Sequence, residues 1–107
     1  MLLGPGGTPE TDVYYAQDSR GMTELGSSAV RFLHNRHTAG HVAAPIPTRV
    51  ADLPALRVVA TYPTGSETAV VLRSGAYAYL LVKRITRGDD PYRVRQAAAA
   101  LDSFRPL

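Results

Sequence analysis

Hydrophobic and polar positions alternate most regularly in the second half of the chain. Three runs there, residues 56–62, 67–73 and 76–85, are rich in Val, Leu and Ile, and β-branched side chains favour half-buried strands. The last two runs are joined by Ser74-Gly75, a dipeptide that suits a tight hairpin turn with a positive φ. Because short links force neighbouring strands to be antiparallel, the pattern predicts a three-stranded antiparallel meander over residues 56–85.

Neither face of this predicted meander is purely polar. In its last strand Leu80 and Val82 lie on one face, and Tyr79 and Leu81 lie on the other. A sheet with one face in water would show a cleaner alternation of apolar and polar residues. We therefore expect both faces to meet something, whether a helix, the N-terminal segment or another copy of the chain.

A helix is predicted before the meander, over about residues 23–38. Apolar side chains recur there at helical spacing and form one stripe, made by Met22, Leu25, Ala29, Phe32 and Leu33. Gly26 interrupts the stripe and costs about 1 kcal/mol relative to Ala in a helix, so the firm part of this prediction is residues 28–37. Gly40 is expected to end the helix.

A second helix is predicted after the meander, over residues 91–104. Asp90 is a suitable N-cap, and Pro91 suits the first helical position because its missing N–H is harmless there. The apolar stripe of this helix is Val94, Ala97, Ala98, Leu101 and Phe104. Since alanines permit close approach, we expect the C-terminal helix to pack on one face of the sheet.

The other segments are expected to be extended. We expect residues 1–11 to form a flexible tail. Residues 12–17 are expected to form either a short edge strand or an extended arm. Residues 42–55 contain three prolines, of which Pro47 excludes a continuous central strand. The sequence thus predicts one α+β domain over residues 12–107, with an antiparallel sheet of three to five strands.

The hairpin and helix that close the chain, ending Leu101-Asp102-Ser103-Phe104, resemble the end of small PsbP-like domains. The resemblance concerns the last third of the sequence. It implies an architecture in which a closing helix lies on a sheet, and no functional residue follows from it.

Length and composition limit the class of protein. The 107 residues are enough for one domain with a modest core, and no run approaches the roughly 18 apolar residues of a membrane span. Met1 and the two leucines after it run directly into Gly4, which does not resemble a signal peptide. The simplest expectation is a cytoplasmic protein, with a trimmed piece of an exported protein as the alternative. The absence of Cys excludes disulfides and thiolate metal sites.

Charge is unevenly distributed along the chain. Residues 1–27 carry four acidic side chains and one basic one, whereas the remainder carries five acidic and eleven basic ones. Nearly all the basic residues are Arg, which binds phosphates and carboxylates in bidentate fashion. An anion-binding surface would explain this excess, but so would a GC-rich coding sequence, which the abundance of Ala, Gly and Pro favours.

Three histidines form a candidate metal site. His34, His37 and His41 would lie on one helix face if the helix extended that far, and imidazole is a ligand for zinc, copper and nickel. Against this interpretation, Gly40 is expected to break the helix, and no nearby carboxylate would obviously orient an imidazole. A solvated helix end is the alternative.

Aromatic and basic side chains near the last strand form a candidate ligand-binding patch: Tyr77, Tyr79, Arg84, Arg87, Tyr92 and Arg93. Such a mixture suits single-stranded nucleic acid, but the sequence has no motif of an RNA- or DNA-binding module. Charges along a sheet edge also guard against edge-to-edge pairing. A nucleic-acid partner is therefore not the favoured interpretation.

For function, the lack of clustered acid, base and nucleophile favours a non-catalytic binding or interaction module without a cofactor, whose partner is another protein or a second copy of itself. The alternative is a small isomerase- or cyclase-like enzyme with a tyrosine-lined pocket between helix and sheet. A histidine-based metal-binding protein is the second alternative. A small-molecule ligand is compatible with the first two.

Overall fold

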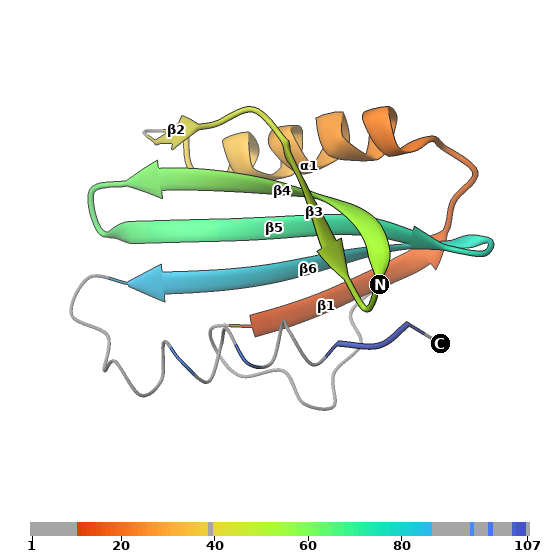
Figure 1. Ribbon diagram of the computed structural model, residues 1–107. Coiled ribbons are helices and arrows are strands. Elements are labelled where there is room, and N and C mark those ends of the chain that lie inside the picture. Colours follow the sequence, from red (N-terminus) through yellow and green to blue (C-terminus); the bar gives the residue numbers. More distant parts are fainter. Residues whose placement is uncertain (1–10, 39, 87–94, 96–98, 100–103, 107) are drawn as a thin grey trace.

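The computed structural model describes residues 11–38, 40–86, 95, 99 and 104–106. Its elements in chain order are β1 (Thr11–Gln17), α1 (Met22–Arg36), β2 (His41–Val42), β3 (Ile46–Val50), β4 (Leu53–Tyr62), β5 (Gly65–Ser74) and β6 (Tyr77–Thr86). The strands form a six-stranded antiparallel sheet in the order β1-β6-β5-β4-β2, with β3 pairing to β4 beside β2. Helix α1 lies across one face of this sheet (Figure 1). The predicted α+β class is confirmed, but the sheet has six strands and not the expected three to five, because residues 41–50 contribute two short strands, β2 and β3, that pair with β4.

Strands β4, β5 and β6 are the predicted antiparallel meander. The prediction placed the last turn at Ser74-Gly75, which is one residue too early, because Ser74 pairs with Tyr77. The turn residues are instead Gly75 and Ala76, and Gly75 has φ of 59°. A positive φ at the first central position of a two-residue hairpin is a conformation that glycine adopts without strain.

Three further strands lie at the edges: β1 beside β6, and β2 and β3 beside β4. Residues 12–17 belong to β1, which pairs antiparallel with β6 and confirms the edge-strand interpretation. Residue 11 is part of this strand, so the expected tail ends earlier, and residues 1–10 lie outside the described part of the chain. Pro47 is tolerated in β3 because that strand has β4 as its neighbour on one side.

Helix α1 runs without interruption from Met22 to Arg36. The helix predicted over about residues 23–38 is therefore confirmed, and it begins before residues 28–37, the firm part of that prediction. The reason for Gly26 lies in packing, because a Cβ on this residue would stand 2.7 Å from Cδ1 of Leu56 in β4. The glycine lets the first half of the helix approach the sheet more closely than another residue would.

Both faces of the sheet carry a hydrophobic cluster, as the sequence predicted. The cluster beneath α1 contains Leu25, Ala29, Leu33, Val58, Ala60, Ala69 and Val71. The opposite cluster contains Ala55, Val70, Leu72, Tyr79 and Leu81, and Phe104 packs against it. The Phe104 ring meets the Tyr79 ring edge-on, with 5.3 Å between centroids.

The helix that covers the sheet in the described structure is the N-terminal one and not the predicted C-terminal one. The sequence placed a C-terminal helix on the sheet, whereas the helix that the structure describes in full lies between β1 and β2. The predicted C-terminal helix falls largely on residues outside the described part of the chain. Within the described ranges, no helix is both long and apolar enough to cross a membrane.

Candidate functional site

A pocket of about 280 Å³ lies between α1 and the β1–β6 side of the sheet, and we call it the helix–sheet pocket. Its lining comprises Tyr14, Tyr15, Ala16, Asp18, Arg20, Leu25, Ser28, Ala29, Phe32, Val71, Ala78, Tyr79 and Leu80. Aliphatic and aromatic side chains make up most of this wall, and Asp18, Arg20 and Ser28 lie together on one side of it, joined by hydrogen bonds. Small-molecule sites typically combine an apolar wall with a few polar groups.

The space arises where small side chains face one another. Ala29 of α1 looks toward the strands that carry Ala16 and Ala78, and these two alanines are directly paired across β1 and β6. At the side, the rings of Tyr14 and Phe32 meet at 62° with 6.2 Å between centroids. Large aromatic rings thus hold the helix away from the sheet edge while the alanines leave the interior unfilled.

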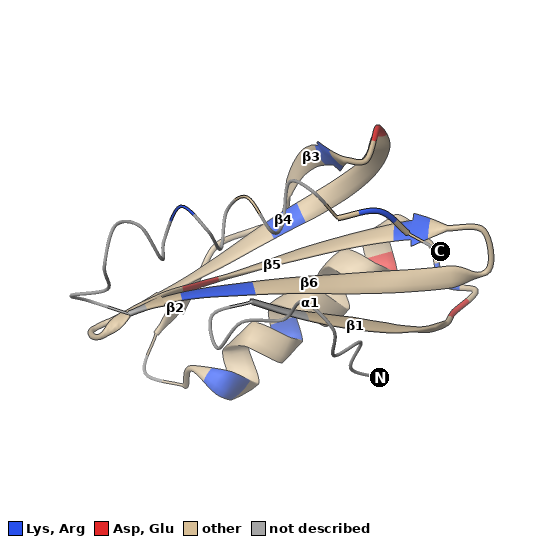
Figure 2. Ribbon diagram, turned by 90° about the horizontal axis from the view of Figure 1, so that it is seen from below, with Lys and Arg blue, Asp and Glu red and all other residues tan. Residues whose placement is uncertain are grey.

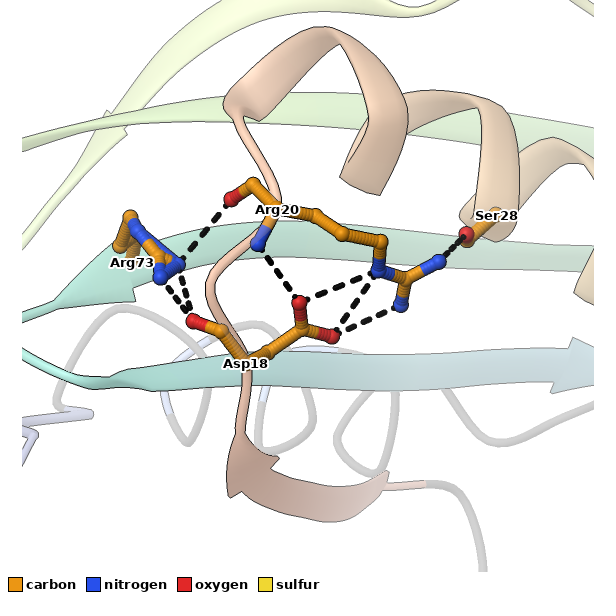
Figure 3. Close-up of polar contacts among 4 residues, drawn as sticks. All are labelled: Asp18, Arg20, Ser28 and Arg73. Carbon is orange, nitrogen blue, oxygen red and sulfur yellow. Dashed lines mark hydrogen bonds and ion pairs between the residues drawn. The ribbon is translucent and has the colours of Figure 1, made fainter.

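The loop between β1 and α1 supplies the charged side chains of the lining, Asp18 and Arg20, and we call this side of the pocket its mouth. Figure 3 shows the contacts of these two residues with Ser28 and Arg73. The Arg20 guanidinium donates to the Asp18 carboxylate from Nε at 3.1 Å to each oxygen and from Nη2 at 2.8 Å. Its Nη1 donates to Ser28 Oγ at 2.7 Å. Arg73 of β5 donates to the backbone carbonyls of Asp18 and Arg20. These bonds fix the loop against the start of the helix and the end of the sheet.

Electrostatics at the mouth follow from these bonds. The side-chain hydrogen bonds from Arg20, helped by its backbone N–H, lower the pKa of Asp18 from 3.8 to about 2. Asp18 is therefore a carboxylate throughout the neutral range. The same pairing raises the pKa of Arg20, so the guanidinium keeps its charge.

A second polar group lies where α1 ends, and we call it the Glu67 cluster: Arg36, His37, Tyr62 and Glu67. The Glu67 side chain is 1% exposed. Arg36 Nη2 donates to its Oε2 at 2.9 Å, and His37 Nε2 lies 2.8 Å from its Oε1. A buried carboxylate requires such charge-assisted partners, and here they join the last turn of the helix to β5.

Tyr62 completes the Glu67 cluster through its ring. The rings of His37 and Tyr62 are stacked at 4.0 Å and 11°. The Tyr62 hydroxyl is buried and has no hydrogen-bond partner among the described residues, and burial, followed by the charge of Glu67, raises the pKa of this phenol. The imidazole is hydrogen-bonded to the carboxylate but only stacked on the phenol ring. None of these side chains lines the helix–sheet pocket.

The three candidate metal ligands are not brought together. Helix α1 ends at Arg36 and His37 is its C-cap, so the condition for a shared helix face is not met. His34 and His41 are exposed, the latter on β2. In the part of the chain that the structure describes, no group of three or more His, Asp or Glu side chains could hold a metal ion. The expectation that no carboxylate orients an imidazole was wrong for His37, because Glu67 does so.

The candidate ligand-binding patch is divided between the two faces of the sheet. Tyr77 and Tyr79 face away from α1, and Tyr79 is 1% exposed within a hydrophobic cluster. Arg84 pairs across the strands with Glu67 and so faces α1. Figure 2 shows the acidic position of β5 beside the basic positions of β6. The other members of the patch, Arg87, Tyr92 and Arg93, lie outside the described residues.

Sequence reasoning missed the polar mouth of the pocket. Asp18 and Arg20 lie in a short segment with the composition of a turn, and Ser28 is one of two adjacent serines in the predicted helix. The Glu67 cluster did have a signal in the sequence, because Glu67 is a charged residue on the same strand face as Ala69 and Val71. The sequence matches no protein-family model and has no significant match among curated proteins, so the candidate function is argued from the site itself.

Proposed function

We propose that this protein is a non-catalytic binding module that takes a small, largely apolar molecule into the helix–sheet pocket. The observation that carries the proposal is the pocket itself: about 280 Å³, walled mainly by aliphatic and aromatic side chains, with its charged side chains, Asp18 and Arg20, at the mouth. That volume is close to the roughly 300 Å³ lower end of the range for small-molecule sites. The ligand is correspondingly small.

Binding is favoured over catalysis because the reactive side chains and the pocket do not coincide. An isomerase- or cyclase-like enzyme needs an acid or base within hydrogen-bond reach of the bound substrate. The His37–Glu67 pair has that chemistry, but it lies at the far end of α1 and is absent from the pocket lining. The acid in the lining, Asp18, is held as a carboxylate by Arg20.

The test uses N-phenylnaphthylamine, an uncharged dye whose fluorescence rises in apolar surroundings. We expect saturable binding to the wild-type protein. Ala16 is an exposed part of the pocket wall, so Ala16→Trp covers the pocket without entering the core. This variant should weaken dye binding at least about tenfold.

The matched control is Gln17→Trp, which places the same ring at the next residue, on the opposite face of β1. It should leave the affinity within about twofold of wild type, as surface substitutions usually do. Absence of dye binding to the wild type, or equal weakening by both variants, would contradict the proposal.

Self-association is a second proposal, favoured by apolar side chains on the face opposite α1. Ile46 and Tyr77 are 49% and 39% exposed on that face. Phe104 covers part of the same face, so the proposal concerns the remainder. Light scattering after size-exclusion chromatography should show a dimer that Tyr77→Asp dissociates, and a monomer at every concentration would contradict it.

A further inference from the structure

We propose that the ligand of the helix–sheet pocket has an apolar body ending in a carboxylate, and that Arg20 and Ser28 bind this carboxylate at the mouth. The inference rests on the proposed binding function and adds the chemical class of the ligand. Its basis is the hydrogen-bonding capacity that the mouth leaves unused.

The first part of that capacity belongs to Arg20. A guanidinium has five N–H donors. In Arg20, the Nε–H and one N–H of Nη2 are directed at Asp18, and one N–H of Nη1 is donated to Ser28. One N–H on each terminal nitrogen therefore has no acceptor within the described residues. The side chain is 47% exposed, so a ligand can reach these donors from the open side of the pocket.

Ser28 adds a further donor. Its Oγ accepts the bond from Arg20 at 2.7 Å, which leaves the hydroxyl hydrogen to be donated elsewhere. No acceptor for this hydrogen is found in the described part of the chain. Because Ser28 also lines the helix–sheet pocket, the hydroxyl is available to a molecule bound there.

The Asp18 carboxylate at the mouth, in contrast, is fully used. Each oxygen of the Asp18 carboxylate accepts two bonds from Arg20: Oδ1 from the backbone N and Nε, and Oδ2 from Nε and Nη2. A carboxylate has about four lone-pair sites. Asp18 therefore cannot receive a ligand's ammonium group without giving up Arg20, so the charged group that the mouth offers to a ligand is the Arg20 guanidinium.

The net charge at the mouth favours an anionic ligand group over a neutral group that accepts hydrogen bonds. Arg73 brings a second guanidinium to the backbone carbonyls beside the mouth, so Asp18, Arg20 and Arg73 together carry one net positive charge. Glu24, exposed in the first turn of α1, contributes the weakest of the effects on the Arg20 pKa. A carboxylate would complete the charge balance and accept bidentate bonds from Arg20.

The test compares three probes with the same apolar chain: octanoate, octanol and octylamine, each displacing N-phenylnaphthylamine at neutral pH. We expect octanoate to bind several-fold more tightly than octanol, and octylamine to bind most weakly. Arg20→Gln should remove the preference for octanoate over octanol. Ser28→Ala should reduce that preference in part while octanol binding stays the same.

Two further variants show whether the effect of Arg20→Gln is specific to that arginine or a general effect of charge on the helix. Arg31→Gln removes an exposed arginine of the same helix that does not line the pocket, and it should leave the preference intact. Glu24→Gln should strengthen octanoate binding slightly. Dye binding with no preference among the three probes, or a preference for octylamine, would overturn this inference and leave the binding proposal standing. Failure of the dye to bind would overturn both.

Discussion

Glu67→Gln is the substitution that most sharply tests how α1 is held on the sheet. Glutamine keeps the size and one acceptor oxygen but removes the charge that faces Arg36 and His37 at 2.9 and 2.8 Å. A hydrogen bond to a charged group contributes about 1.5–3 kcal/mol. Because the Arg36 side chain is 34% exposed, water replaces part of its lost interaction.

The expected loss is therefore about 2 kcal/mol in the free energy of unfolding, which is roughly one such bond rather than two. Glu67→Ala should cost more, about 3–4 kcal/mol, because it also leaves a cavity and a buried imidazole without its partner. The assay is urea denaturation followed by circular dichroism, in which an unchanged slope shows that unfolding still exposes the same surface.

The matched control is Glu24→Gln, which removes an exposed carboxylate from the first turn of the same helix. It should change the free energy of unfolding by no more than about 0.5 kcal/mol. If Glu67→Gln also fell within that margin, the Glu67 cluster would not be holding the last turn of α1, and the reasoning would be refuted.

Three further predictions concern the backbone, acid stability and helix packing. Ala51 has φ of 51° in the tight link between β3 and β4, so Ala51→Gly should raise the melting temperature by relieving about 1 kcal/mol of strain. The control Ala76→Gly, in the turn between β5 and β6, should not raise it, and equal effects of the two substitutions would contradict this prediction. The pKa of Asp18 is about 2 in the folded protein against an ordinary 3.8, so the contribution of this carboxylate to stability is present above pH 3.8 and is lost as pH falls toward 2. The difference in unfolding free energy between wild type and Asp18→Asn should therefore shrink over that pH interval, and a constant difference would contradict the pairing with Arg20. Gly26→Ala should be more favourable by about 1 kcal/mol in a Leu56→Ala background than in wild type, as measured by a denaturation double-mutant cycle, and additivity would show that the two residues do not meet.

Much of the sheet could be predicted because its pairing is local. The links between β4, β5 and β6 are too short for anything other than antiparallel neighbours, and periodicity assigned their faces correctly. The sequence could predict β1 as an edge strand, but it could not show that the partner of β1 is β6, because the two segments are separated by most of the chain. Hydrophobic pattern indicates that a strand exists, whereas its neighbour depends on the packing of the whole domain.

The candidate site was harder to predict, for two physical reasons. The pocket is the space that side chains leave unfilled between the helix and the sheet. The small side chains of Ala29 and Ala78 create this space, but the sequence does not show that they face each other. The contact between His37 and Glu67 likewise joins residues far apart in sequence. The division of the tyrosine–arginine patch could have been foreseen, since Tyr79 and Arg84 are an odd number of positions apart on one strand.

The central claim is that a small apolar ligand occupies the space between α1 and the β1–β6 side of the sheet. The most direct measurement is NMR of alanine methyl groups during titration with N-phenylnaphthylamine. The methyl signals of Ala29 and Ala78, which line the helix–sheet pocket, should shift and saturate together. Those of Ala55, on the opposite face, and Ala60, beside the Glu67 cluster, should stay in place. Shifts confined to Ala55 or Ala60 would contradict the account.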